Sequence, residues 1–209
     1  MWNYDYFEKT LHNHGYRFIA GVDEVGRGAL AGPVMAAAVV FDGSGDYRDF
    51  RDSKTLSPRR REVLSQRIQR LSPAVAFGVA SERTVDRLNV LRATQRAMRQ
   101  AVRSLPLRPD IVLVDGFWLS RLPVTCIGIV DGDALSYTIA AASIVAKVKR
   151  DAWMRSASPR YPQYGFERNV GYGTPQHLQA LASLGPCRIH RRTFAGVRET
   201  LGFGGCHGR

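Results

Sequence analysis

Apolar residues along the chain gather into short runs that predict a mixed α/β architecture. Five stretches have the length of a strand and are continuously apolar or loosely alternating; they cover about residues 18–24, 34–41, 74–80, 111–114 and 125–130. Two longer stretches, about 82–104 and about 135–155, have the apolar spacing of helices. In the second helix, Ser143, Lys147 and Arg150 fall on one face, and the positions expected to be buried are Ile139, Ala142, Val145 and Ala146. The order of these elements predicts a mixed β-sheet covered by helices, an α/β fold.

Helix-starting and chain-breaking residues mark the boundaries between these runs. Ser57 and Pro58 predict a helix N-terminus, and we expect that helix to continue through Leu71. Residues 1–17 are polar and aromatic and predict a short helix over the core. Beyond about residue 155, the prolines and glycines predict short helices joined by loops. Because no repeat or long linker interrupts the chain, we expect one domain over residues 1–209.

The charge balance indicates a polyanionic partner. Lys and Arg number 30 against 18 Asp and Glu, a net charge of +12. Residues 147–209 hold eleven Lys and Arg against three acids, and residues 48–70 hold eight against three. Such an excess favours nucleic acid first and an anionic membrane second. A generally basic, well-solvated surface is the alternative that needs no partner.

Other features of the composition indicate where the protein works. No run approaches the roughly 18–20 uncharged apolar residues of a membrane span, and the N-terminus lacks the features of a signal peptide. Three cysteines without C-x-x-C spacing favour a reduced compartment. Cys206 and His207 are too few to predict a metal site. We therefore expect a cytoplasmic monomer that does not bind a membrane.

Four carboxylates share one position in the pattern, since each follows an apolar strand: Asp23, Glu24, Asp115 and Asp133. If those strands are neighbours, the acids meet at one edge of the sheet. Like charges gathered there raise each other's pKa unless a cation lies between them. Ligands that offer only oxygen suit Mg²⁺ or Mn²⁺. Two such ions about 3.5–4 Å apart can activate a water and stabilise the leaving oxygen in phosphodiester hydrolysis.

Each acid also has a structural interpretation. Asp133 could cap the helix that follows it, and Asp115 with Gly116 could form an ordinary turn. Asp23 and Glu24 raise a different problem, because adjacent strand residues point to opposite faces. Both can serve one site only if the chain departs from a straight strand, and we expect a bend at Glu24–Gly26. A straight strand with Glu24 buried on the far side would remove it from the site.

The glycine-rich segment Gly26–Gly32 has a rival interpretation as a loop that binds a dinucleotide phosphate. That loop must open a helix. Pro33 and the apolar run 34–41 follow here instead. A second strand is therefore predicted, and a nucleotide cofactor is disfavoured.

The chain resembles the ribonuclease HII family, the type 2 ribonucleases H, in motifs that occur in order over about residues 18–202. The matching motifs are Gly21–Gly28, Asp52–Lys54, Asn89–Thr94, Val114–Gly116, Gly132–Asp133, Ala140–Val148, Tyr161–Phe166, Gly171–Thr174 and His190–Phe194. The resemblance implies an endonuclease that hydrolyses the RNA strand of RNA–DNA hybrids and cuts 5′ of single ribonucleotides in duplex DNA. It also implies a ribonuclease H-like core over about 18–155 and a small helical C-terminal segment over about 156–202.

The resemblance also assigns roles to individual residues. The four carboxylates would hold Mn²⁺ or Mg²⁺ for two-metal hydrolysis that leaves 3′-OH and 5′-phosphate ends. Gly26, Arg27 and Gly28 would sense the ribose 2′-hydroxyl, which glycine lets the backbone approach closely. Tyr172 would stack on the sugar at the deoxy side of the junction, although it could also be a packed loop aromatic. The implied phosphate contacts are Lys54, Ser143 and Lys147, with a structural role still open for the last two.

Three positions depart from the family pattern. Val170 stands where the family often has Lys, so one backbone contact could be missing, and Thr55 stands where a second Lys commonly follows the Asp-Ser-Lys motif. Asp131 stands where Lys is common before Gly132-Asp133, which raises the question of which acid is the ligand. The motif alignment favours Asp133.

Two other classes of function compete with a hybrid-specific nuclease. A non-catalytic nucleic-acid-binding module would gain nothing from acids placed where phosphate docks, so the strand-terminal carboxylates disfavour it. A nuclease of the same fold that acts on DNA is disfavoured by Gly26-Arg27-Gly28 together with Tyr172, because these match a ribose-sensing site.

Overall fold

The computed structural model describes residues 4–50 and 56–204, in which the predicted mixed sheet is confirmed. Five strands lie in the order β3-β2-β1-β4-β5. β1 pairs antiparallel with β2 and parallel with β4, and β3 and β5 form the edges. The strands are β1 (Ile19–Val25), β2 (Val34–Phe41), β3 (Ala74–Ala80), β4 (Ile111–Asp115) and β5 (Thr125–Ile129).

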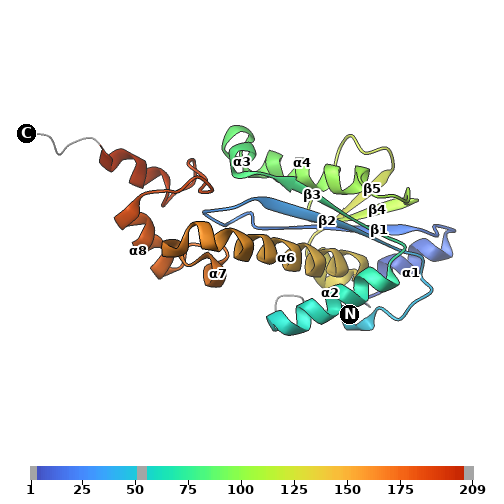
Figure 1. The fold of residues 1–209 in the computed structure, drawn as a ribbon. Coiled ribbons are helices and arrows are strands. Elements are labelled where there is room, and N and C mark those ends of the chain that lie inside the picture. The colour runs from blue at the N-terminus through green and yellow to red at the C-terminus, as the bar shows by residue number, and fades with distance from the viewer. Residues whose placement is uncertain (1–3, 51–55, 205–209) are drawn as a thin grey trace, which may run out of the picture.

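Helices cover both faces of this sheet (Figure 1). On one face lie α3 (Glu82–Leu88) and α4 (Val90–Arg103), and on the other lie α2 (Pro58–Leu71) and α6 (Tyr137–Ala157). The first helix, α1 (Tyr6–Asn13), packs with β1, β4 and β5 in a smaller apolar cluster. β2 is buried along its whole length, which explains why its apolar run is continuous rather than alternating. A 3₁₀ turn, Arg48–Phe50, lies between β2 and α2.

The single helix expected over about 82–104 is wrong, because two helices meet there at Asn89. Asn89 has a φ of +67°, which no helix accommodates, and its side chain accepts a hydrogen bond from the Arg92 N–H at 3.0 Å. It is thus the N-cap of α4. A similar junction precedes the last long helix, since the short α5 (Gly132–Leu135) ends where Ser136 caps α6. Capping by Asn and Ser breaks helices that the apolar spacing alone would join.

The position of α6 against the sheet depends on Gly21 of β1. A Cβ at this position would lie 2.0 Å from the backbone carbon of Thr138. Only glycine lets the start of α6 come this close to the strand. The contact brings α6 alongside the carboxyl end of β1, and four positions predicted to be buried on this helix are confirmed: Ile139, Ala142, Val145 and Ala146.

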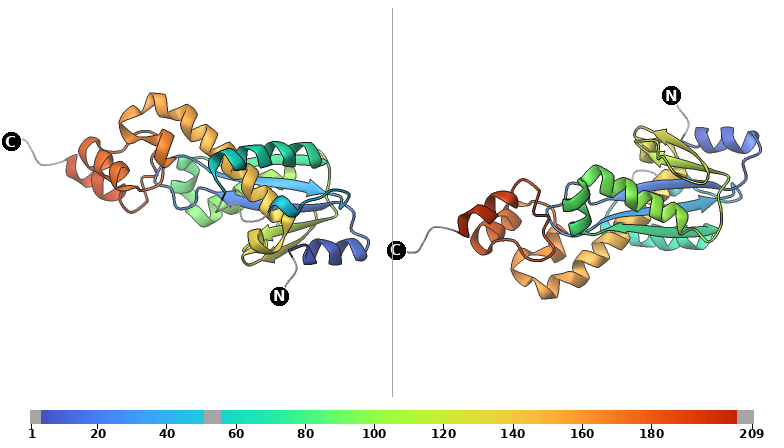
Figure 2. Two further views of the ribbon diagram at one scale, coloured as in Figure 1. Left: turned by 90° about the horizontal axis from the view of Figure 1, so that it is seen from below. Right: turned by 90° about the horizontal axis from the view of Figure 1, so that it is seen from above.

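The C-terminal elements form a separate apolar cluster beyond the end of the sheet (Figure 2). They are the short turns Ser158–Arg160 and Pro162–Tyr164, α7 (Phe166–Asn169), α8 (Pro175–Leu184) and the turn Arg198–Gly204. The loop after β1 joins this segment, because the N–H groups of Leu30 and Ala31 donate to the Gly171 carbonyl. The predicted short helices are confirmed, and the assignment of residues 1–209 to one domain stays a prediction. None of the described helices is long and apolar enough to cross a membrane.

Candidate active site

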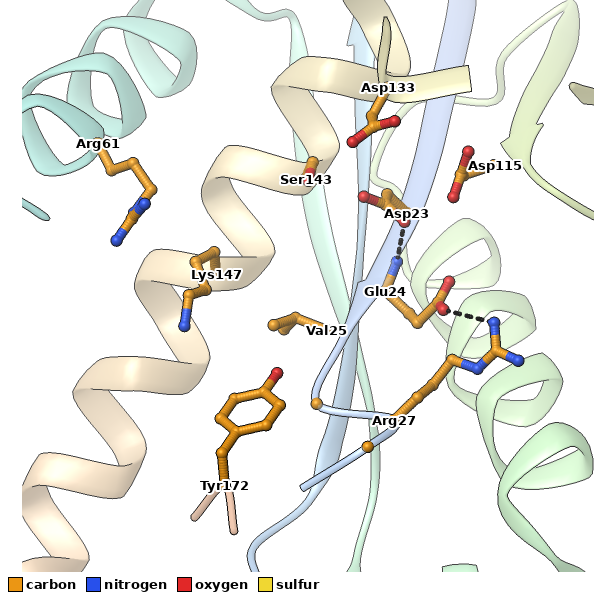
Figure 3. Close-up of a pocket in the computed structure, with 12 residues that line it drawn as sticks. Asp23, Glu24, Val25, Arg27, Arg61, Asp115, Asp133, Ser143, Lys147 and Tyr172 are labelled. Carbon is orange, nitrogen blue, oxygen red and sulfur yellow. Dashed lines mark hydrogen bonds and ion pairs between the residues drawn. The ribbon is translucent and has the colours of Figure 1, made fainter. Parts of the chain in front are cut away.

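Three acids come together where β1 and β4 end (Figure 3). Asp23, Glu24 and Asp115 each place a carboxylate oxygen within 4.8 Å of the others. The parallel register sets Val22 opposite Val114, so Asp23 and Asp115 follow at the same level on neighbouring strands. The prediction that strand-end acids meet at one edge of the sheet is confirmed for these three.

The bend expected at Glu24–Gly26 falls at the last of these residues, because β1 pairs regularly with β2 through Val25. The chain departs from the strand only at Gly26, which has a φ of +90°. Glu24 still reaches the site because the pairing of β1 with β4 stops at Val22, so no β4 residue pairs with it. Its long side chain lies beyond the end of β4 and meets Asp115 there. Glu24 is therefore not buried on the far side of the sheet.

Asp133 lines the same pocket as the three clustered acids but lies outside their compact group. Figure 3 shows its carboxylate pointing toward Asp23. The interpretation of Asp133 as a helix cap is wrong, since Asp131 is the N-cap position of α5 and Ser136 caps α6. Asp131 is exposed and lies outside this pocket. Of the two candidate acids, Asp133 is the one that faces the others.

Burial raises the pKa of Asp23 well above its usual value, and the nearby charges of Glu24 and Asp115 raise it further. A hydrogen bond from Ser143 and one from the Glu24 N–H, at 2.6 Å, oppose this shift. Burial also raises the pKa of Glu24, against the effect of Arg27, whose Nη1 lies 3.2 Å from a Glu24 oxygen. Buried carboxylates that repel one another are stabilised by a cation. The oxygen-only donor set fits a hard divalent ion.

Asp115 is held in place by the backbone of the next element. Its Oδ1 accepts a hydrogen bond from the Gly132 N–H at 2.7 Å, which ties the end of β4 to the start of α5. Gly116 has a φ of +76°, so the turn interpretation of Asp115-Gly116 is also correct. One residue therefore ends a strand, opens a turn and faces the pocket.

The loop of Gly26, Arg27 and Gly28 is held from behind by a fully buried arginine. The Arg191 guanidinium donates to the Gly26 carbonyl at 2.7 Å and to the Arg27 carbonyl at 2.8 Å. It also donates twice to the Gly32 carbonyl, at 2.9 and 3.0 Å. Burial, together with repulsion by Arg150, lowers the pKa of Arg191 to about 9. Arg191 belongs to a motif of the sequence, but no role was predicted for it.

Arg150 holds the neighbouring backbone through hydrogen bonds from its guanidinium group. It donates to the carbonyls of Pro33, Val170 and Ala31 at 2.9, 2.9 and 3.1 Å. The sequence predicted Arg150 on one helical face with Ser143 and Lys147, but its side chain is buried, unlike theirs. Its guanidinium carbon lies 5.4 Å from the centroid of the Tyr172 ring. The two buried arginines thus hold the glycine loop and the Tyr172 loop together.

Tyr172 lines the pocket, and a pair of buried histidines supports its backbone. The Cys187 N–H donates to His190 Nδ1 at 3.0 Å, so a neutral His190 carries its proton on Nε2. That nitrogen lies 3.0 Å from His177 Nε2, and His177 Nδ1 lies 2.8 Å from the Tyr172 carbonyl. The chain of donors is complete only when both rings are neutral. Burial lowers the pKa of both histidines, that of His190 to about 4.

The pocket, about 500 Å³ in volume, brings most of the predicted site residues together. Besides the four acids, it is lined by Gly26, Arg27, Gly28, Ser143, Lys147 and Tyr172. Lys147 pairs with Asp151 at 2.8 Å and lies 5.7 Å from the Tyr172 ring centroid. Lys54, Thr55, Cys206 and His207 lie outside the described residues.

Arg61 of α2 also lines the pocket, although no sequence argument singled it out. It donates to the Leu56 carbonyl at 2.6 Å. The basic run Arg59–Arg61 at the start of a predicted helix was the available signal. It could not show which of the three arginines lines the pocket.

Known proteins resemble this chain in both sequence and structure. A family model described as Ribonuclease HII matches residues 20–197. The ribonuclease HII of Geobacter sulfurreducens is 50% identical over 200 residues, which cover 96% of this chain and 92% of that protein. The ribonuclease HII of Albidiferax ferrireducens is 51% identical over 183 residues, 88% of each chain.

Solved structures share the fold. The crystal structure of ribonuclease H2 from Pyrococcus horikoshii is 26% identical, with a TM-score of 0.75, over 88% of this chain and 96% of that one. Ribonuclease HII of Archaeoglobus fulgidus, solved in a complex with PCNA, is 25% identical with a TM-score of 0.71, over 83% and 92% of the two chains.

Proposed function

The chain belongs to the ribonuclease HII family of metal-dependent nucleases acting on RNA–DNA hybrids, and we propose that it also cuts 5′ of single ribonucleotides embedded in duplex DNA. The observation that carries this proposal is the shared pocket. Three clustered acids lie within the same cavity as Gly28 and Tyr172, the residues expected to recognise a ribose and its deoxy neighbour. Recognition and chemistry would then act on adjacent nucleotides.

The acids of the pocket would perform the hydrolysis. Asp23, Glu24, Asp115 and Asp133 would hold Mn²⁺ or Mg²⁺, and the bound ions would supply an activated water and stabilise the leaving oxygen. The products would carry 3′-OH and 5′-phosphate ends. The chain positions these ligands itself, through the Ser143 hydrogen bond to Asp23 and the Gly132 N–H that fixes Asp115.

Gly28 supports a direct approach of the substrate to the loop. A Cβ at Gly28 would meet no atom of the chain within 4 Å, and its φ lies outside the left-handed region. No feature of the described fold therefore requires glycine there. A sugar that packs against the backbone would require it. Lys147 and Arg61, on neighbouring walls of the pocket, would contact phosphates.

The direct test is a labelled DNA duplex that contains one ribonucleotide, incubated with and without a divalent ion. We expect a metal-dependent cut immediately 5′ of the ribonucleotide and no cut in the matching all-DNA duplex. Equal cleavage of the all-DNA duplex would instead identify a DNA nuclease. Titration with Mg²⁺ and Mn²⁺ in parallel would establish which ion the site prefers.

Asp131 and Asp133 provide a matched pair for the same assay. Asp133→Asn removes the acid that lines the pocket and should abolish cleavage, whereas Asp131→Asn removes an exposed acid two residues away and should leave it nearly unchanged. The reverse result would move the ligand assignment to Asp131.

A further inference from the structure

The outer face of α4 carries a row of arginines that plays no part in the pocket described above. Arg92, Arg96, Arg99 and Arg103 recur at spacings of four, three and four residues, which places them on one side of the helix. Arg121, in the loop between β4 and β5, lies across a groove from them, and no acid lines that groove. The remaining lining residues are Leu88, Gln95, Gln100, Ser104 and Ser120. We call this surface the α4 arginine groove.

The charges of the α4 arginine groove are not neutralised by the fold. Within residues 4–50 and 56–204, none of its five arginines forms an ion pair with a carboxylate. The basic helix on the opposite face of the sheet differs, because Arg67 of α2 pairs with Asp49, and Glu62 of α2 pairs with Arg155 of α6. Partial burial lowers the pKa of Arg99, and repulsion by Arg103 and Arg121 lowers it further. A concave surface of one sign attracts an external polyanion.

The groove is also organised rather than merely basic. Arg103 donates to the Arg121 carbonyl at 2.7 Å, and Arg121 has a φ of +63°. This bond holds the loop after β4 against the helix, and Figure 1 shows that loop on the same face of the sheet as α4. Arginine presents a planar fork of donors that suits phosphate oxygens.

The loop that forms one wall of the groove starts beside the acid site. The loop that carries Ser120 and Arg121 leaves β4 directly after Asp115. Five residues of extended chain reach at most about 18 Å, so Ser120 lies no farther than that from Asp115. Between them, Phe117 and Trp118 are 58% and 65% exposed, and such aromatics can pack on sugars or bases. A duplex rises about 3.4 Å per base pair, so this span is at most about five base pairs.

We propose that the α4 arginine groove holds the sugar–phosphate backbone of the duplex arm on one side of the cleavage site. The proposal rests on the proposed function, since that function places the scissile bond at the acids. The row from Arg92 to Arg103 extends about 16 Å, at 1.5 Å per helical residue, which is the length of about five base pairs. An arm of three base pairs, about 10 Å long, is too short to run along this row, whereas an arm of twelve, about 40 Å long, can cover both the row and the loop.

The test compares duplexes that carry one ribonucleotide and differ in the length of one arm. Arg96→Gln/Arg99→Gln should bind a duplex with two twelve-base-pair arms about tenfold more weakly than the unchanged protein, without divalent ions. The slope of log affinity against log salt should fall by about 1.8, at roughly 0.9 for each lost phosphate contact. Shortening one of the arms to three base pairs should make the two proteins bind alike, and shortening the other should not.

Matched variants separate a specific groove from general charge. Arg17→Gln/Arg70→Gln removes the same charge at the end of the sheet where β1 begins, away from the acids, and should change neither affinity nor slope by a comparable amount. Arg96→Lys/Arg99→Lys keeps the charge and should retain most of the salt slope. Melting curves of all variants should coincide, because the substituted side chains make no described ion pair.

Two results would overturn the proposal. The first is an equal loss of affinity on long-arm and short-arm duplexes, or in the control variant, which would indicate general charge. The second is unchanged duplex binding, which would leave the groove to another partner such as an acidic protein. Binding is measured without metal, and an all-DNA duplex can be added as a probe. A chain that binds through the groove but never cleaves would contradict the proposed function alone.

Discussion

The two walls of the pocket carry buried charges of opposite sign, carboxylates in one and guanidinium groups behind the other. The sheet wall gathers the carboxylates of Asp23, Glu24 and Asp115, which lie close enough to repel one another, and Arg27 lies beside Glu24. The facing wall, formed by the glycine loop and the Tyr172 loop, is held by the guanidinium groups of Arg150 and Arg191. Those groups are already satisfied by backbone carbonyls.

Because of this difference, we expect substitutions in the two walls to affect activity and stability differently. The carboxylates of the sheet wall raise the pKa of Asp23 by mutual repulsion, so these side chains work against stability in the free protein. The facing wall is complete without a ligand, and its buried cations stabilise the loops that would touch the substrate. Substitutions in the first wall should therefore remove activity and spare the fold. Substitutions behind the second wall should cost stability as well.

The largest effect is expected from Asp115→Asn on the sheet wall. Cleavage should fall by more than about a thousandfold, because the site loses one of its clustered ligands. Without metal, the variant should melt at the same temperature or slightly higher, since repulsion of Asp23 is relieved and asparagine can still accept from Gly132. Single-turnover cleavage and melting in a chelator measure the two effects. An active Asp115→Asn protein would contradict the assignment of Asp115 as a metal ligand.

Behind the facing wall, Arg191→Gln should lower the free energy of unfolding by about 2–4 kcal/mol. The guanidinium donates to three carbonyls, two of them buried, that glutamine cannot all reach. Arg191→Lys should not restore stability, because a compact ammonium lacks the planar fork. Urea unfolding measures the change. The control is Arg155→Gln, whose exposed pair with Glu62 at 3.5 Å should contribute less than about 0.5 kcal/mol.

Tyr172 belongs to the facing wall but projects into the pocket, so its removal should alter selectivity more than folding. We expect Tyr172→Ala to reduce cleavage at a lone ribonucleotide about tenfold more than cleavage of a long hybrid. Only the lone ribonucleotide has a deoxyribose neighbour in the cleaved strand, which Tyr172 would contact. Tyr172→Phe keeps the ring and should retain most of the preference. Equal losses on both substrates would count against a role at the junction.

The smallest effect concerns pH and the histidines beneath Tyr172. The pKa of His190 is lowered to about 4, against about 6.5 in an unfolded chain. Between those values the unfolded chain binds a proton that the folded protein does not, so stability should decline as the pH falls from about 6.5 to 4. The slope from this residue is at most about 1.4 kcal/mol per pH unit. Denaturant unfolding of the protein and of His190→Gln should differ in slope, and identical slopes would refute a neutral His190.

Much of the sheet could be predicted from the sequence, because strands buried between two helical layers consist of continuous apolar runs. Val34–Phe41 is the plainest example, with every residue buried. The same runs located the acids, since each strand stops being apolar where it leaves the core. The break at Asn89 was missed because a cap acts through one side chain and leaves the apolar spacing of the flanking helices intact.

The sequence by itself therefore determined which residues could form strands and which acids follow them, and its charge favoured an anionic partner. Only the tertiary structure decided that Glu24 reaches the site from a straight strand, that Arg61 faces the pocket and that Arg150 is buried. It also placed Arg191 behind Gly26, a contact across 165 positions of the chain. The physical reason is that apolar burial leaves a local period in the sequence. A guanidinium that binds distant carbonyls leaves none, because any carbonyl can accept its hydrogen bonds.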